Sequence, residues 1–240
     1  MTNTIQNIPL LNLAIAFVPV LAAIAIMFKW SLAANRAVYA IGRMLAQLLL
    51  IGYFLAYIFE SDSAMVIVLI LAVMVAASSW IALGAAGEMR NSLFTSSFLA
   101  ILIGGVFTLG LVTQGVLATD PWFLPQTMIP LAGMIFANSM NSVSLAAERL
   151  QAELNHKMDW TSARNTAFQA AMIPIINSLF AVGLVSLPGM MTGQILSGVS
   201  PLIAARYQIM VMCMVFGSAG ISTAIFLVIG KSKFQLSGVR

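Results

Sequence analysis

The sequence is poor in charge. Lys, Arg, Asp and Glu make up 8% of its 240 residues, whereas soluble globular domains carry about 25%. Hydrophobic residues make up 61%, and the mean hydropathy is +1.01. So few charges cannot cover a water-facing surface, which excludes a soluble globular domain. The composition predicts an all-α integral membrane bundle over residues 1–240, a single transmembrane domain with the lipid bilayer as a partner. Despite the net charge of +4, we expect no nucleic acid as a partner.

Cysteine, histidine and catalytic motifs are also scarce. Cys213 is the only cysteine and His156 the only histidine, so no internal disulfide can form. HExxH, GxSxG and Cys/His clusters do not occur. The letters GKS at 230–232 are not a phosphate loop, because Ile225 stands where that loop needs a glycine. The chain is therefore predicted to be no enzyme and to bind no cofactor, and no motif identifies a metal site.

Carboxylates are absent from the apolar segments. Every Asp and Glu lies in or near a predicted loop. Proton relays and ion pumps use acids buried in the membrane, so this distribution argues against such a pump. If the protein moves a solute uphill, the energy source is expected to be external.

Long apolar stretches are abundant. A membrane helix needs about 20 mostly apolar residues, and seven stretches qualify. They are residues 8–28, 38–59, 64–83, 94–117, 128–147, 170–187 and 203–229. Pro174 lies inside the sixth, and Pro188 and Gly189 break its far end.

The positive charges lie in alternate loops. Lys and Arg occupy the first, third and fifth loops and the C-terminal tail, whereas the other loops hold Glu60, Asp62 and Asp120, with Arg206 as the basic exception. The positive-inside rule then places the N-terminus outside and the C-terminus in the cytoplasm. An odd number of spans agrees with this orientation.

The fifth loop, residues 148–174, is the largest cytoplasmic loop in this topology. Its charged residues are Glu148, Arg149, Glu153, Lys157, Asp159 and Arg164. We expect a helix over 145–158, a capping residue at Asp159, and an amphipathic helix over 161–174 that runs into the sixth span. This helical pair is either a lever for a cytosolic partner or a solvated loop that fixes topology.

Polar residues inside two predicted spans form a second candidate region. They are Arg43 and Gln47 in the second span, and Asn138, Asn141 and Ser142 in the fifth. Helical spacing places each group on one face. Such a face lines a polar path, or it makes hydrogen bonds between helices worth about 0.6–2 kcal/mol each. Arg43 either pairs with Glu88 or donates to backbone carbonyls.

The stretch 183–201 is too rich in glycine and proline for a plain helix. It contains Pro188, Gly189, Thr192 and Gln194. Irregular backbone at membrane depth survives where protein or a water-filled cavity satisfies it, which indicates a gate or substrate path. The alternative is an outer loop with a kinked helix end.

Soft sulfur atoms gather nearby in MVMCMV, residues 210–215. Thioethers and thiolates bind Cu(I). However, alternating methionines are scattered around a helix axis, and methionine is a flexible packing residue, so packing is the favoured interpretation.

Three stretches carry a family resemblance. They are GRMLAQLLLIGYFLAYIF at 42–59, IPLAGMIFANSMNSVSLAAERL at 129–150, and LVSLPGMMTGQILSGVSPLIAARYQIMVM at 184–212. With them, the chain resembles the FetB-type permeases from about residue 36 to 230. This family comprises membrane subunits of ABC transporters, including bacterial iron-export permeases and plant proteins linked to aluminium tolerance.

The resemblance implies a transport subunit in a bacterial plasma membrane, worked by a separate cytosolic ATPase that binds ATP and Mg²⁺, with two permease copies forming the pore. It assigns ATPase coupling to Glu148, Arg149, Asp159, Trp160 and Arg164. The path residues are then Arg43, Gln47, Asn138, Asn141, Ser142, Pro188, Gly189, Thr192 and Gln194. Iron as cargo follows from the resemblance alone. The alternatives are a permease for another solute, such as a sugar nucleotide, and a non-transporting scaffold or assembly protein.

Overall fold

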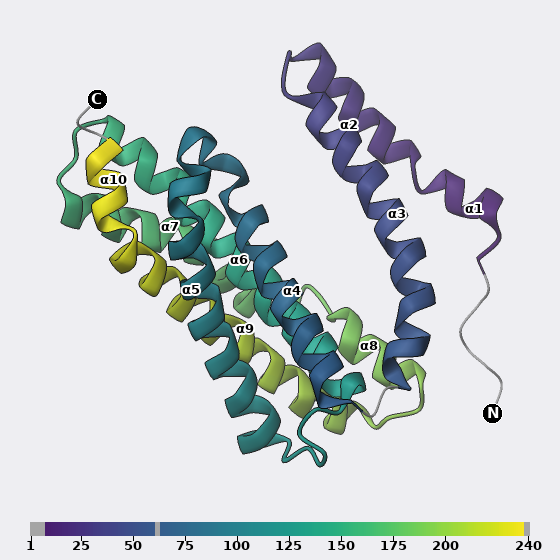
Figure 1. Ribbon diagram of the computed structural model, residues 1–240. Coiled ribbons are helices and arrows are strands. Elements are labelled where there is room, and N and C mark those ends of the chain that lie inside the picture. Colours follow the sequence, from purple (N-terminus) through teal and green to yellow (C-terminus); the bar gives the residue numbers. More distant parts are fainter. Residues whose placement is uncertain (1–7, 61–62, 238–240) are drawn as a thin grey trace. The chain divides into compact units, whose positions relative to one another are not determined.

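The computed structural model describes residues 8–60 and 63–237. Within these residues the regular elements are helices, apart from one isolated bridge between Val182 and Ser186. Figure 1 shows their arrangement. The chain divides into two compact units, residues 1–61 and 62–240, which are taken separately below. The all-α prediction is confirmed for the described residues.

Unit 1 is a helical hairpin with a break in its first arm. It contains α1 (Leu10–Ile15), α2 (Val18–Lys29) and α3 (Ala34–Phe59). The first predicted span is therefore two helices, since Pro19 near the start of α2 has no N–H to donate to the carbonyl of Ile15. The apolar side chains of α1 and α2 are largely exposed, as expected for helices that face lipid.

Unit 2 contains the remaining helices. They are α4 (Ala64–Ala82), η1 (Leu83–Ala85), η2 (Gly87–Met89), α5 (Arg90–Gly110), the π-helical turn η3 (Leu111–Val116), α6 (Pro125–Asn155), α7 (Trp160–Ala181), α8 (Gly189–Leu196), α9 (Pro201–Ile229) and α10 (Lys231–Ser237). The long helices alternate in direction (Figure 1). The α4–α5 turn, the α6–α7 turn and α10 consequently lie at one end, and α8 lies toward the other.

Among the described residues, five helical segments are long and apolar enough to cross a membrane. They are Leu10–Lys29, Ala34–Phe59, Ala64–Ala82, Gly87–Val116 and Pro201–Ile229. The other two predicted spans, 128–147 and 170–187, fall largely within α6 and α7, which are more polar. The sixth predicted span, 170–187, also ends early. The helix α7 stops at Ala181, and Gly183 turns the chain with a φ of +83°. Seven spans and the orientation of the termini therefore stay predictions.

Small residues hold the centre of unit 2 together. α9 packs against α5, α6, α7 and α8, and its buried face includes Ser218, Ala219, Ser222 and Thr223. Lipid is as apolar as a leucine side chain, so membrane helices associate through close contact and hydrogen bonds rather than by expelling water. The Ser222 hydroxyl accordingly lies 3.2 Å from that of Ser139 on α6.

Two adjacent glycines of α5 make this close contact possible. A Cβ at Gly104 would lie 2.4 Å from Ser222 Oγ and 2.9 Å from the Ser222 backbone nitrogen. A Cβ at Gly105 would lie 2.6 Å from Cε1 of Phe136 on α6. α5 therefore approaches α9 through one glycine and α6 through the next.

We expect Gly104→Ala to lower the stability of the bundle, because the new methyl group would push α5 away from the backbone of α9. Overpacking of this kind costs about 1–3 kcal/mol. Thermal unfolding in detergent should show a lower Tm. The matched control is Gly110→Ala on the same helix, where a Cβ meets no heavy atom within 4 Å. Equal losses of Tm in the two variants would contradict the assigned contact.

Candidate functional site

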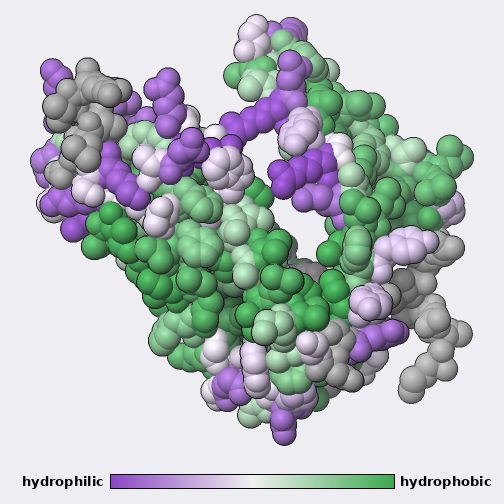
Figure 2. All heavy atoms as spheres, in the orientation of Figure 1, coloured by the Kyte–Doolittle hydropathy of each residue, from purple (hydrophilic) through white to green (hydrophobic). Residues whose placement is uncertain are grey.

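The predicted coupling segment lies at the charged end of unit 2. Figure 2 shows hydrophilic side chains gathered there, while hydrophobic side chains cover the flanks of the helices. The segment is a hairpin in which α6 extends to Asn155, the chain turns over 156–159, and α7 begins at Trp160. Both predicted helices are confirmed. The charges therefore lie on two helices and on the short turn that joins them.

Asp159 caps α7 as predicted. Its backbone is extended, and Oδ2 accepts a hydrogen bond from the Ser162 N–H at 3.0 Å. Lys157 makes the preceding reversal with a φ of +61°. Hydrogen bonds from the Ser162 side chain, and then from its backbone N–H, lower the pKa of the Asp159 carboxyl from 3.8. The carboxylate form is thus the one that holds the start of α7.

The predicted coupling residues on α6 differ in their surroundings. Glu148 is exposed. Arg149 forms an ion pair with Glu153 one turn later, and Glu153 is buried. Glu153 is not among the predicted coupling residues, although its i,i+4 spacing from Arg149 is a signal for such a pair. Half of the Arg149 side chain remains exposed.

Trp160 connects the hairpin to the C-terminal helix. The Nζ of Lys231, the first residue of α10, lies 5.8 Å from the centre of the Trp160 ring. A cation within about 6 Å of an indole face is attracted by the negative face of the ring. This contact holds α10 beside the α6–α7 turn.

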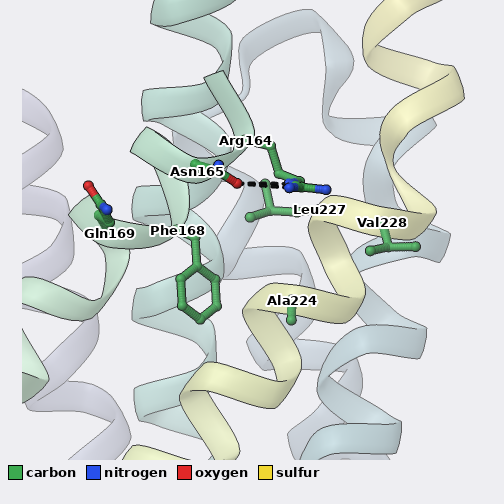
Figure 3. Close-up of a pocket in the computed structure, with 7 residues that line it drawn as sticks. All are labelled: Arg164, Asn165, Phe168, Gln169, Ala224, Leu227 and Val228. Atoms are coloured by element: carbon green, nitrogen blue, oxygen red, sulfur yellow. Dashed lines mark hydrogen bonds between the residues drawn. The ribbon is translucent and has the colours of Figure 1, made fainter. Parts of the chain in front are cut away.

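Arg164 lies over a cavity between α7 and α9. Its Nε and Nη2 donate to Oδ1 of Asn165 at 3.1 and 2.9 Å (Figure 3). The cavity has a volume of about 380 Å³, and Phe168 points into the space beside Ala224 and Leu227. Among the described residues, the positive charge of Arg164 has no salt-bridge partner.

Buried alanines let α7 pack closely against α6. Ala163, Ala167 and Ala171 recur every four residues and are all buried, while α7 packs closely against α6. The predicted amphipathic helix thus buries mainly small side chains, with Met172 as the large exception. The sequence signal was the four-residue alanine spacing, which permits a close helix pair.

The polar residues of α6 do not all share one surface. Asn138 is partly exposed and its Nδ2 donates to the Met134 carbonyl of the same helix at 2.8 Å. Asn141 is exposed, whereas Ser142 is buried in the bundle. The two amides therefore lie on the outward face of α6 and the hydroxyl on the inward face. Their role in a path stays a prediction.

The glycine-rich stretch forms a short helix between two turns. Pro188 precedes α8, which begins at Gly189, and the Thr192 hydroxyl donates to the Pro188 carbonyl at 3.1 Å. Gln194 Oε1 is buried, with no hydrogen-bond partner among the described residues. The predicted interruption is confirmed, and a path role for these residues stays a prediction.

Arg43 and Gln47 lie on α3 in unit 1, where both are exposed. Their assignment to a path, and the pairing of Arg43 with Glu88, stay predictions. In contrast, Arg90 of the third loop has a defined place. Its Nε and Nη2 donate to the Trp80 carbonyl at 3.2 and 2.8 Å, and its guanidinium carbon lies 3.9 Å from the Trp80 ring centre. Arg90 therefore closes the α4–α5 turn.

Metal ligands of the usual kind are not clustered. Within residues 8–60 and 63–237, no group of three or more His, Cys, Asp or Glu side chains is placed to hold a metal ion. The polar surfaces of α6 and α8 instead offer amides and hydroxyls.

Comparison with known proteins identifies the family. The family model described as an uncharacterised protein family, UPF0014, matches residues 10–235. The chain belongs to the UPF0014 family. Its apolar helices and membrane-protein relatives make it an integral membrane protein. No solved structure matches it.

Three UPF0014 relatives are similar over most of their length. The probable iron export permease protein FetB of Escherichia coli is 35% identical over 97% of this chain and 94% of its own. The UPF0014 membrane protein slr1647 of Synechocystis is 35% identical over 79% of each chain. Protein ALUMINUM SENSITIVE 3 of Arabidopsis thaliana is 30% identical over 88% of this chain and 81% of its own.

In this UPF0014 chain we expect Asp159→Ala to loosen the start of α7, since the Ser162 N–H loses its acceptor. Amide hydrogen exchange of the peptide around Ser162 should be faster at neutral pH. Asp159→Asn is the matched control, because asparagine caps helices about as well as aspartate. Unchanged exchange in Asp159→Ala would contradict the cap.

The same cap has a defined pH dependence. A carboxyl whose pKa is lowered on folding adds stability above its unfolded pKa, and that stability is lost as the pH falls through the folded pKa. The difference in protection of the Ser162 amide from hydrogen exchange between wild type and Asp159→Ala should therefore be constant around neutral pH. It should shrink only below pH 3.8. A difference that fades well above that value would contradict the direction of the shift.

Proposed function

We propose that this protein is the permease subunit of an ABC exporter for iron or another metal ion, powered by a separate cytosolic ATPase. The single structural observation behind the proposal is the rigid α6–α7 hairpin at the charged end. The similarity to a probable iron export permease over 97% of the chain supports the choice of cargo. The ATPase would bind ATP and Mg²⁺, and this subunit would carry the solute.

The hairpin has the features that coupling requires. Its charged residues lie on helices that pack along the buried alanines, so a push on the turn moves α7 as one body. α7 has 22 residues and is about 33 Å long. It ends at the 182–188 turn before α8, so motion at the charged end would reach the broken segment at the other. This is a rigid-body coupling mechanism.

We place the docking point at Arg164, whose guanidinium has no salt-bridge partner among the described residues. It lies beside a cavity of about 380 Å³ that opens between α7 and α9. An acidic group on the ATPase would pair with the guanidinium, and an apolar side chain would fit beside Phe168. The exposed Glu148 would extend the contact to α6.

We further propose that two copies form the pore. Asn138 and Asn141 lie on the outward face of α6, and amides facing hydrocarbon are costly. A pore shared by two permeases would give these amides a polar surrounding.

Topology labelling tests where the hairpin lies. In a Cys213→Ser background, we expect Lys157→Cys to react with a membrane-impermeant maleimide only from the cytoplasmic side. Ser197→Cys, in the turn after α8, is the control and should react from the outside. Labelling of position 157 from outside would place the hairpin beyond the reach of a cytosolic ATPase and refute the proposal.

Transport in inside-out vesicles tests the activity. With the co-expressed ABC ATPase, we expect ATP-dependent uptake of ferrous iron and no uptake of a sugar nucleotide. Arg164→Glu should lower uptake about tenfold, as expected for about 1.4 kcal/mol of lost docking energy. The control is Arg206→Glu, an exposed charge near the start of α9. Uptake of the sugar nucleotide alone would identify a different permease, and movement of neither solute would favour a scaffold.

A further inference from the structure

A second cavity lies toward the end of unit 2 opposite the hairpin. It has a volume of about 380 Å³ and is formed by the last turn of α7, the following turn, α8 and the first half of α9. Most of its lining is apolar, including Leu179, Ala205 and Ile209. It is separate from the cavity beside Arg164.

Three sulfur-bearing side chains line this cavity. Met191 comes from α8, and Met212 and Cys213 come from α9. The alternation of methionines in 210–215 favours packing, and Met210 and Met214 indeed lie outside the lining. The fold, however, adds Met191 from a different helix, and thereby places two thioethers and the only thiol of the chain around one space.

A buried polar side chain is among the residues that line the same cavity. Gln208 is 6% exposed and is among the lining residues. Its Oε1 has no hydrogen-bond partner among the described residues. An unpaired buried acceptor is costly, so a cation bound in the adjacent cavity would be attracted by this oxygen.

We infer that this cavity is a binding site for a soft monovalent cation of the Cu(I) or Ag(I) class, held by Met191, Met212 and Cys213. Thiolate and thioether sulfur are the donors that such ions prefer. On binding, the Cys213 thiol releases its proton to water and a sulfur–metal bond forms, with no change of oxidation state. One thiolate, one monovalent cation and two neutral thioethers give a complex without net charge.

The neutral complex suits its surroundings. Met212 lies about three turns into α9, where the walls are apolar and a net charge would be poorly solvated. A divalent ion with the same donors would leave one positive charge uncompensated. The charge balance therefore selects a monovalent ion. The site is independent of the proposed transport activity and is tested on the permease alone.

The test uses the full chain in detergent, loaded with one equivalent of Cu(I) under anaerobic, reducing conditions. X-ray absorption at the copper edge counts the sulfur neighbours, and competition with a chromogenic Cu(I) chelator measures affinity. We expect about three sulfur neighbours in the wild type. Met191→Leu and Met212→Leu should each remove one sulfur neighbour and weaken binding about tenfold, while Cys213→Ser should abolish stoichiometric binding.

Neighbouring methionines provide matched controls. Met190→Leu and Met210→Leu change the same residue type on the same helices but lie outside the cavity lining, so they should retain the wild-type sulfur count and affinity. A single sulfur neighbour in the wild type, as in an adventitious thiolate complex at exposed Cys213, would overturn the site. Equal losses in Met190→Leu and Met191→Leu would overturn it as well. The wild-type count stands even if a variant fails to fold.

Discussion

The close contact of α5 with α9 is the constraint on which unit 2 depends. In lipid the hydrophobic effect does not drive helices together, so stability comes from close packing and from hydrogen bonds between hydroxyl groups of different helices. Gly104 lets α5 reach the backbone of α9 at Ser222, and the Ser222 hydroxyl reaches Ser139 on α6. Since α9 also packs on α7 and α8, this one contact fixes both ends of the bundle relative to each other.

The proposed coupling between two distant regions would depend on this packing. At the charged end, the buried alanines pack α7 on α6 and the Asp159 side chain caps the start of α7. At the other end, α7 stops at Ala181 and the chain forms a turn and the short helix α8. A displacement of the hairpin would therefore move the turn after α7 and the helix α8. These segments lie beside the cavity lined by Met191, Met212 and Cys213.

Local features were visible in the sequence because their causes lie within a few residues. The cap at Asp159 and the interruption at 183–201 follow from side chains next to the backbone that they affect. Other local features were missed although signals existed. Pro19 splits the first span into α1 and α2, and the spacing of Arg149 and Glu153 allows their ion pair. The early end of α7 at Ala181, just before the turn at Gly183, lay inside a run that hydropathy alone extends to residue 187.

By itself the sequence determined the environment, the helical class and the family, because hydropathy, charge placement and long matching stretches are properties of the linear chain. The tertiary structure alone decided which face of each helix is buried. An apolar helix has no strong polarity around its axis, so its rotation is set by neighbours far away in the chain. That is why Asn141 lies outward and Ser142 inward on α6, and why Met191 shares a cavity with Met212 and Cys213 while Met210 does not.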